Sequence, residues 1–285
     1  RSDGRPTYNF ANTVDDMLDG ITHVIRGQDH ISNTPKQLQI LRALGAEPPV
    51  YAHAPDVLGT DGKKLSKRHG AQSVEDFHRQ GYLPEALVNF LARLGWAYDD
   101  KKEVFSRDEL LELFSLERVS PSPAVFDYQK LSWLNGVHLR ELSPEEYASR
   151  VVEYLRDAGL DWDEELVRRA APLVQEKIEK LDQFPDYTRF FFEEVSPAVP
   201  LDGAGPVLEQ AEQALAGVEP FEAEAIEREL RSLAERMELK PRDAFQPIRI
   251  AVTGSKVSPG LFESLELLGR DETLRRLATV RAEAV

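Results

Sequence analysis

Four basic side chains lie in the short segment GTDGKKLSKRHG, residues 59–70: Lys63, Lys64, Lys67 and Arg68. Ammonium groups on a loop between glycines can move with negative charge as it shifts between phosphate groups. The segment is not a Gly-x4-Gly-Lys-Ser/Thr phosphate loop, because Gly59 and Gly62 are wrongly spaced for that motif. Charged turns are also common on solvated surfaces. The segment alone therefore leaves two interpretations, a phosphate-binding loop and a surface turn.

Residues 21–45 supply elements that could carry such a loop. Residues 21–25 are apolar and β-branched, which predicts a buried strand. The segment TPKQ, 34–37, has a capping-box pattern with proline at the first helical position, and Gly45 is placed to end that helix. This order forms half of a βαβ unit. We therefore expect Arg26 and Asp29 just past the carboxyl end of a strand, where open α/β sheets bind ligands.

The composition is that of an acidic globular protein and excludes several kinds of chemistry. The 285 residues are 41% hydrophobic and 30% charged, with a formal net charge of −15. This balance argues against non-specific coating of nucleic acid but not against a local basic face. Because there is no cysteine and the six histidines are scattered, we exclude a cysteine nucleophile and expect no protein-bound zinc or other metal site. Without a long apolar run or a basic leader, we expect no membrane span and a cytoplasmic location.

The rest of the chain has mainly helical patterns. Helices are expected over 84–94 and 107–114, and Ser143 begins a pattern that is helical almost to the end. Later helix starts are expected near Asp163, Glu222, Pro241 and Asp271. The proline- and glycine-rich stretch VSPAVPLDGAGP is typical of a linker between two helical bundles. These patterns predict a multidomain α/β plus all-α protein, divided into residues 1–70, 71–141, 142–195 and 206–285.

A resemblance to class I aminoacyl-tRNA synthetases rests on KLSKR, 64–68, which looks like their Lys-Met-Ser-Lys-Ser loop in the variant typical of the glutamyl enzymes. It extends over PTYNFANTVDDMLDGITHVIRGQDHISNTPKQ, LSKRHGAQSVEDFHRQGYLPEALVNFLARLGW, FDYQKLSWLNGVHLREL and FQPIRIAVTGSKVSPGLFESLELLG. It implies the second half of the catalytic nucleotide-binding fold, a mixed mainly helical stem-contact domain, and an α-helical anticodon-binding region. It also implies that glutamate is activated by ATP with Mg²⁺ and transferred to the 3′ adenosine of tRNA(Glu), by a monomer.

The resemblance assigns the lysine loop to ATP. Lys64 and Lys67 would stabilise the charge that moves onto the leaving pyrophosphate. Ser66 would orient the loop or donate to a phosphate, and Leu65 belongs to the same ATP-binding segment. For Arg68, a surface charge and a phosphate contact to tRNA are both open, and we expect the tRNA contact.

The resemblance also implies a glutamate pocket. Arg26 would hold the substrate side chain, since a guanidinium can bind a carboxylate through two hydrogen bonds. Tyr8 and Asn12 would complete the pocket and, four residues apart, would share a helical face. Asp29 and His30 would lie near the ATP ribose and base. The residues alone leave other interpretations: an ion pair of Arg26 with an upstream aspartate, a core position for Tyr8, and a structural role for His30.

Basic residues gather near the carboxyl end of this otherwise acidic chain. They are Lys240, Arg242, Arg249, Lys256, Arg275 and Arg276. Such charges often lie on a solvated helix face. The resemblance implies instead that they contact tRNA, because arginine can stack on splayed bases or pair with phosphates. Which of them reads the anticodon stays open.

Two family features are missing from this sequence, the His-x-Gly-His signature and the acceptor-binding insertion. We therefore expect the chain to begin in mid-domain, as part of a longer enzyme, and to form no glutamyl-adenylate by itself.

Three alternatives compete with this hypothesis. A non-catalytic tRNA-binding paralogue would have no need of Tyr8, Arg26, Lys64 and Lys67 together. A tRNA-modifying relative that forms glutamyl-adenylate lacks the helical anticodon region, and glutaminyl enzymes have β-barrels there instead of helices. Whether the enzyme also acylates tRNA(Gln) stays open.

Overall fold

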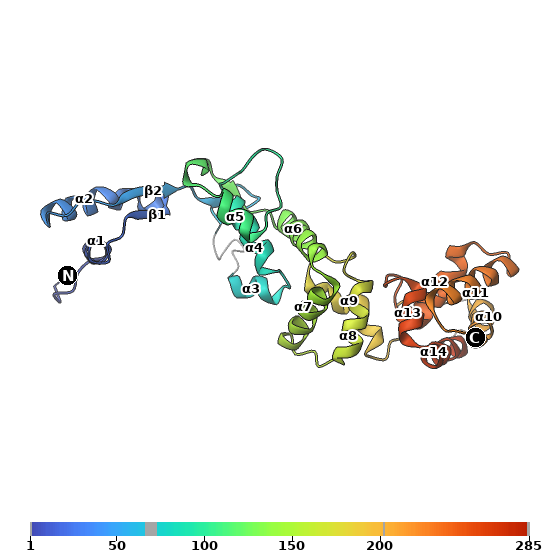
Figure 1. The fold of residues 1–285 in the computed structure, drawn as a ribbon. Helices are drawn as coiled ribbons and strands as arrows, with labels where there is room; N and C mark the ends of the chain where they lie inside the picture. Colours follow the sequence, from blue (N-terminus) through green and yellow to red (C-terminus); the bar gives the residue numbers. More distant parts are fainter. Residues whose placement is uncertain (1, 66–72, 202, 284–285) are drawn as a thin grey trace. The chain divides into compact units, whose positions relative to one another are not determined.

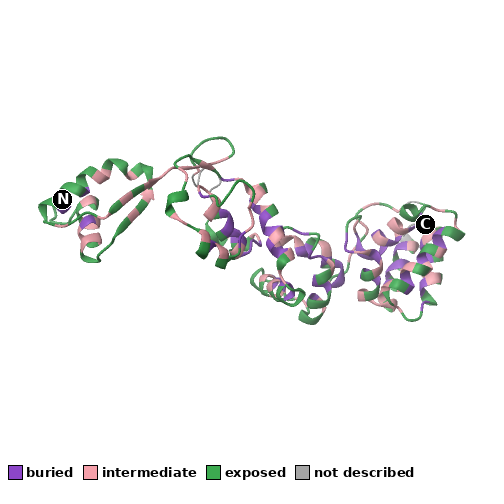
Figure 2. Cartoon of the chain, turned by 45° about the horizontal axis from the view of Figure 1, so that its top comes forward, coloured by how far each residue is buried: buried purple, intermediate pink, exposed green. Residues whose placement is uncertain are grey.

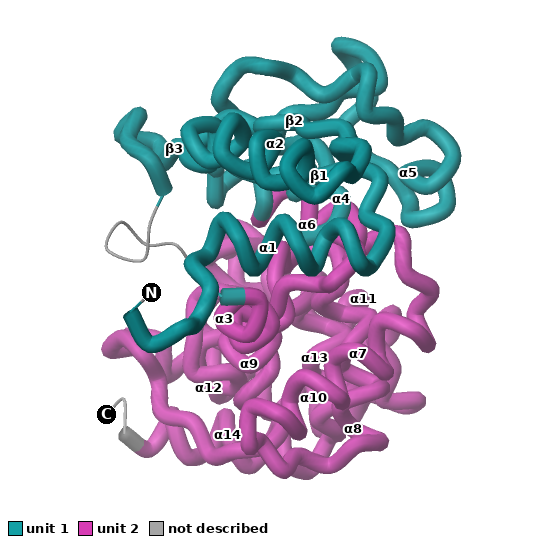
Figure 3. Tube along the Cα trace, turned by 90° about the vertical axis from the view of Figure 1, so that its left-hand side faces the viewer, with its two compact units in different colours: residues 1–73, 87–131 teal, residues 74–86, 132–285 magenta. Residues whose placement is uncertain are grey.

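The computed structural model describes residues 2–65, 73–201 and 203–283, without the side chain of Glu283. The chain forms two compact units, coloured separately in Figure 3. Unit 1 comprises residues 1–73 and 87–131, and unit 2 comprises residues 74–86 and 132–285. The division into four segments expected from the sequence stays a prediction.

Unit 1 contains short strands and helices, several of which are labelled in Figure 1. Their bounds are α1 (Tyr8–Leu18), β1 (His23–Gly27), the 3₁₀ helix η1 (Gln28–Asn33), α2 (Thr34–Ala43), β2 (Val50–Ala54), β3 (Val57–Leu58), α5 (Arg107–Leu113), η3 (Leu116–Arg118) and β4 (Ala124–Val125). Two helices contain a boundary between the units, α4 (Pro84–Arg93) and α6 (Tyr128–Glu141). The predicted helices over 84–94 and 107–114 are therefore confirmed to within a residue.

β1 and β2 form a parallel two-stranded sheet whose register pairs His23 with Val50 and Arg26 with His53. The order of strand, loop and helix is as predicted, but β1 begins two residues later than expected, so Arg26 lies inside the strand. The expectation of a buried strand is wrong, because Ile25 is 53% exposed and Val50 60%. Figure 2 shows this part of the chain mainly as exposed and intermediate.

The predicted capping box at the start of α2 does not form. Asn33 occupies the N-cap position without a side-chain cap hydrogen bond, and Thr34 is already the first helical residue. Proline is in the first turn as expected. The side chains of Thr34 and Gln37 are instead bonded to Arg26.

Unit 2 is helical. Its elements are α3 (Val74–Arg79), α7 (Pro144–Asp157), α8 (Glu164–Ala170), η4 (Ala171–Leu173), η5 (Leu181–Gln183), α9 (Phe184–Thr188), η6 (Arg189–Phe191), α10 (Gly205–Ala216), α11 (Ala223–Arg236), α12 (Pro241–Thr253), α13 (Leu261–Leu268) and α14 (Arg270–Glu283). Ser143 and Asp163 accept hydrogen bonds from backbone amides of the first turns of α7 and α8, as their sequence signals predicted.

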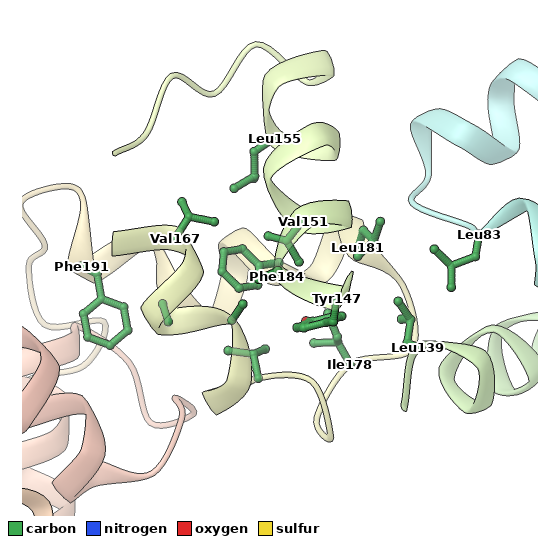
Figure 4. Packing of buried hydrophobic residues seen from close by; sticks show 14 of the residues in the cluster. Leu83, Leu139, Tyr147, Val151, Leu155, Val167, Ile178, Leu181, Phe184 and Phe191 are labelled. Carbon is green, nitrogen blue, oxygen red and sulfur yellow. The ribbon is translucent and has the colours of Figure 1, made fainter. Parts of the chain in front are cut away.

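Two apolar clusters hold unit 2 together. In the first, Tyr147 and Val151 of α7 pack with Ile178, Leu181 and Phe184 (Figure 4). In the second, α10 to α14 contribute fully buried side chains. These include Leu208, Leu215, Ile226, Leu230 and Leu277, each 0% exposed. Burial of this kind supplies most of the stability of helical bundles.

A glycine brings two backbone segments of unit 2 into direct contact. Gly81 has a φ of +76°, and its carbonyl accepts a hydrogen bond of 3.0 Å from the Leu181 amide. A Cβ at this position would lie 2.4 Å from the Asp182 nitrogen. Both the conformation and the spacing therefore require glycine.

Candidate active site

Arg26 lies at the centre of a polar cluster at the sheet of β1 and β2. Its Nη2 donates to Thr34 Oγ1 and to Gln37 Oε1, at 2.8 Å each. Its Nε is 3.5 Å from His53 Nε2, and its guanidinium lies 5.3 Å from the centre of the Tyr51 ring. Arg26 is thus held on several sides by groups from β2 and α2.

All of these contacts of Arg26 are with uncharged oxygen atoms, an imidazole or a ring. Within the described residues, its guanidinium forms no ion pair with a carboxylate, and the upstream aspartates are not among its partners. Burial raises the pKa of the neighbouring Tyr51 hydroxyl, which opposes its ionisation. The positive charge of Arg26 is therefore positioned without a counterion from the described chain.

Tyr8 and Asn12 lie one turn apart on α1, as their spacing predicted. The Asn12 side chain joins the cluster, since its Oδ1 accepts a hydrogen bond of 3.0 Å from Gln37 Nε2. Tyr8 is 53% exposed and is not a core residue. Its ring centre is 5.9 Å from that of His30, whose Nδ1 is 3.2 Å from Asn33 Nδ2.

A second cluster of polar side chains surrounds Lys64. Its ammonium lies 2.7 Å from Asp56 Oδ1 and 3.9 Å from Asp29 Oδ2. Gln28 donates to the other Asp56 oxygen at 2.9 Å. The hydrogen bonds from Lys64 and Gln28 lower the pKa of Asp56, and the bond to Asp56 raises the pKa of Lys64. The structure therefore brings Asp29 and Lys64 together, and holds Lys64 as a cation.

The lysine loop is only partly described. Leu65 is held through its backbone, because its amide donates to Val57 O at 2.8 Å. Ser66, Lys67 and Arg68 lie outside the described residues.

The six basic residues near the carboxyl end differ in their exposure and in their contacts. Arg276 is 7% exposed and donates to Val252 O at 2.7 Å, and Arg249 donates to Ser258 Oγ and Pro259 O. Arg275 forms ion pairs with Glu272 and Glu194. The burial of Arg276 favours a structural role over the predicted RNA contact.

The other three basic residues near the carboxyl end are exposed. They are Lys240, Arg242 and Lys256, at the start of α12 and in the segment after it. No ion pair holds them within the described part of the chain.

Several residues of the site were not found by sequence reasoning. The sequence pattern assigns Thr34 and Gln37 to a helix cap, and it gives His53 and Asp56 no role. Asp56 had a usable signal, since it follows a strand that ends at the edge of the sheet where ligands bind. Among the described residues, no group of three or more His, Asp or Glu side chains is arranged so that it could hold a metal ion. No described helix is long and apolar enough to cross a membrane.

Comparisons with known proteins match both parts of the chain. Residues 1–133 match the family "tRNA synthetases class I (E and Q), catalytic domain", and residues 146–281 match "Anticodon binding domain". A glutamate–tRNA ligase of Thermodesulfovibrio yellowstonii is 44% identical over 98% of this chain and 63% of its own length. Glutamate–tRNA ligase 2 of Rubrobacter xylanophilus is 45% identical over 98% of this chain and 59% of its own.

A solved structure is similar over almost the whole chain. It is a glutamate tRNA ligase from Elizabethkingia meningosepticum in complex with its amino acid, with a TM-score of 0.86 and 28% identity over 99% of this chain and 61% of that one. This chain thus spans less than two thirds of the length of these relatives.

Proposed function

This chain belongs to the class I tRNA synthetases for glutamate and glutamine, and on this premise we propose that it serves as part of a glutamate–tRNA ligase. The reaction activates glutamate with ATP and transfers it to the 3′ adenosine of tRNA(Glu). A class I catalytic part is followed here by a helical anticodon-binding part. One chain carries Arg26, Asn12 and Lys64, so we propose a monomer, working in the cytoplasm where translation takes place.

The observation that carries this proposal is the uncompensated charge of Arg26. A guanidinium held by Thr34, Gln37 and Tyr51 keeps its direction without a carboxylate partner in the described chain. A substrate carboxylate can supply that partner with little reorganisation of the site. Asn12 and Tyr8 would complete the glutamate pocket.

Lys64 suits the ATP side of the reaction. Its ammonium could exchange Asp56 for the phosphates of ATP, which bring a higher negative charge and their own Mg²⁺. Asp29 and His30 would contact the ribose and base, and Leu65, Ser66 and Lys67 would complete the loop. Removal of one such charge contact typically lowers a catalytic rate by about 10²-fold.

The helical part would bind tRNA. We propose that the exposed Lys240, Arg242 and Lys256, together with Arg68, contact phosphates or bases, because the first three of these charges are not neutralised within the described chain. We retain Arg249 and Arg275 as weaker candidates, since both are engaged within the protein. The buried Arg276 is left out.

Catalysis would require more polypeptide than this chain. The exposed Ile25 and Val50 on β1 and β2 are side chains that a further layer would cover. The relatives are longer than this chain, so they have residues that could form such a layer. We expect no tRNA-dependent exchange of pyrophosphate into ATP by the 285-residue chain alone. A non-catalytic tRNA-binding protein remains the second candidate, and it would not need to bind glutamate.

Titration of the chain with glutamate and glutamine, followed by side-chain NMR, tests the proposal. Arg26→Ala should weaken glutamate binding by about 100-fold or more, since removal of one partner of a hydrogen-bonded charge pair typically costs several kcal/mol. Arg42→Ala removes an exposed arginine of α2 and should leave glutamate binding unchanged. Equal binding by the Arg26 and Arg42 variants would refute the proposal.

A further inference from the structure

The side-chain amide of Gln37 connects two residues of the proposed glutamate pocket. Gln37 lies on α2 and is 1% exposed. Its Oε1 accepts from Arg26 Nη2 at 2.8 Å, and its Nε2 donates to Asn12 Oδ1 at 3.0 Å and, at the longer distance of 3.5 Å, to Asn9 Oδ1. At this level of burial no bulk water can replace these bonds.

The direction of this chain of hydrogen bonds follows from Arg26. A guanidinium has donors only, so Gln37 must turn its oxygen toward Arg26 and its nitrogen toward Asn12. Asn12 must then turn its own oxygen toward Gln37. The opposite orientation of either amide would place N–H groups against each other.

The same hydrogen bonds determine which polar groups of the cluster have no partner. The Asn12 Nδ2 group, on the side away from Gln37, has no acceptor in the part of the chain that the structure describes. Both Nη2 hydrogens of Arg26 are used by Thr34 and Gln37, which leaves its Nη1 group. Each of these unused groups is a donor.

We infer that Gln37 is a positioning residue that makes the site select a carboxylate over a carboxamide, by holding the Asn12 amide with its nitrogen outward. A carboxylate only accepts hydrogen bonds and matches a site of donors. The NH₂ of a glutamine side chain would meet donors with no acceptor. The inference rests on the proposed glutamate-binding role of Arg26 and Asn12, and adds to the charge of Arg26 a second source of selectivity.

Gln37→Glu tests the inference with almost no change in shape. The introduced carboxylate can still accept from Arg26 but cannot donate to Asn12, so the Asn12 amide should reverse and turn its oxygen outward. Gln39→Glu places the same charge on an exposed position of the same helix and is the matched control. Gln37→Leu removes the bonds to Arg26, Asn12 and Asn9 but leaves the charge of Arg26 intact, which separates the effect of charge from that of amide direction.

The first measurement needs no substrate. NMR of the 285-residue chain with ¹⁵N-labelled Asn and Gln side chains reports how fast each NH₂ exchanges with water. In the unmodified chain the Gln37 NH₂ should be protected and the Asn12 NH₂ should exchange freely. In Gln37→Glu the Asn12 NH₂ should slow by roughly tenfold, the effect of gaining about one buried hydrogen bond. Gln39→Glu should not change it.

The second measurement compares binding of glutamate and glutamine. The preference for glutamate should fall by about tenfold or more in Gln37→Glu and by less in Gln37→Leu, because loss of a matched donor is worth about that factor. Unchanged Asn12 exchange in Gln37→Glu, with intact glutamate binding, would overturn the inference alone. Slowed Asn12 exchange with no glutamate binding by the unmodified chain or by any variant would refute the proposed function, and the selectivity role with it. Slowed Asn12 exchange together with the reduced preference supports both.

Discussion

The side chains that are most buried differ in kind between residues 2–65 and the α10–α14 bundle. In residues 2–65 the side chains classed as buried are Thr13, Gln37 and Leu41, two of them polar. In α10–α14 they are mainly leucine, isoleucine, valine and alanine, many at 0% exposure. The bundle is therefore stabilised by apolar packing, whereas the first region orients its side chains by directional hydrogen bonds.

This difference fits the functions proposed for the two regions, substrate selection by the first and RNA binding by the bundle. Apolar packing stabilises a shape but tolerates small rearrangements, because dispersion and burial are not directional. Hydrogen bonds among Arg26, Gln37 and Asn12 specify which atom of each side chain faces outward. A site that must distinguish chemically similar substrates needs the second kind of order.

The largest effect on stability should come from a substitution that creates a cavity in the α10–α14 bundle. Leu230→Ala should lower the free energy of unfolding by about 2–5 kcal/mol, since Leu230 is fully buried between helices. Hydrogen exchange of backbone amides in α10–α14 measures it. Val257→Ala, at a side chain 61% exposed, should change it by less than about 0.5 kcal/mol. Similar effects of the two substitutions would contradict apolar packing as the source of stability.

A smaller effect, of opposite sign, is expected at Tyr147. Its side chain is 0% exposed in the first apolar cluster, and its hydroxyl has no hydrogen-bond partner among the described residues. Burial also raises its pKa. Tyr147→Phe should therefore raise the free energy of unfolding by about 1 kcal/mol, because it removes an unsatisfied buried polar group. Slower exchange of α7 amides would show this, and faster exchange would indicate a partner.

A third effect should depend on pH. Hydrogen bonds from Arg275 and Arg276 lower the pKa of Glu272 from 4.5 to about 2. Because the folded-state pKa lies below the unfolded one, this stabilisation is complete above about pH 4.5 and is lost as the pH falls toward about 2. Because Glu272 and Arg275 are partly solvated, which screens their attraction, the stabilisation should amount to about 1 kcal/mol or less. The stability difference between the chain and Glu272→Gln should shrink over this range; a constant difference would exclude the carboxylate as its cause.

The smallest effect is expected at the strand that carries Arg26. Ile25→Thr should change the free energy of unfolding by less than about 0.5 kcal/mol, since Ile25 is 53% exposed and threonine also favours strands. Exchange of the β1 and β2 amides gives the measurement. Leu41→Thr, at 2% exposure, should cost clearly more. A large cost at Ile25 would show that this region also depends on apolar packing.

Local features of the fold could be predicted from the sequence because their causes are local. Ser143 and Asp163 cap helices through residues a few positions away, and Tyr8 and Asn12 share a face through helical geometry alone. The burial of β1 could not be predicted, because the same apolar pattern suits a strand whether or not another layer covers it.

In the candidate site, the strand pattern pointed to Arg26 and Asp29, whereas Tyr8, Asn12 and His30 were assigned roles only by the resemblance. Gln37 contacts Arg26 and Asn12 across 11 and 25 positions of sequence, and these contacts exist only after β1, α1 and α2 have packed together. A glutamine three positions after threonine fits a helix cap equally well. Asp56 was overlooked because its partner Lys64 lies on another segment.

Gly81 has a consequence for how this protein can vary between organisms. Any base change in a glycine codon that alters the amino acid adds at least a Cβ or stops translation, and a Cβ here would meet the Asp182 backbone at 2.4 Å. Backbone atoms cannot turn aside as a side chain does. A saturation library should therefore show uniform depletion at position 81, in contrast to tolerance at Gly205, where a Cβ would meet nothing within 4 Å and the φ is not positive.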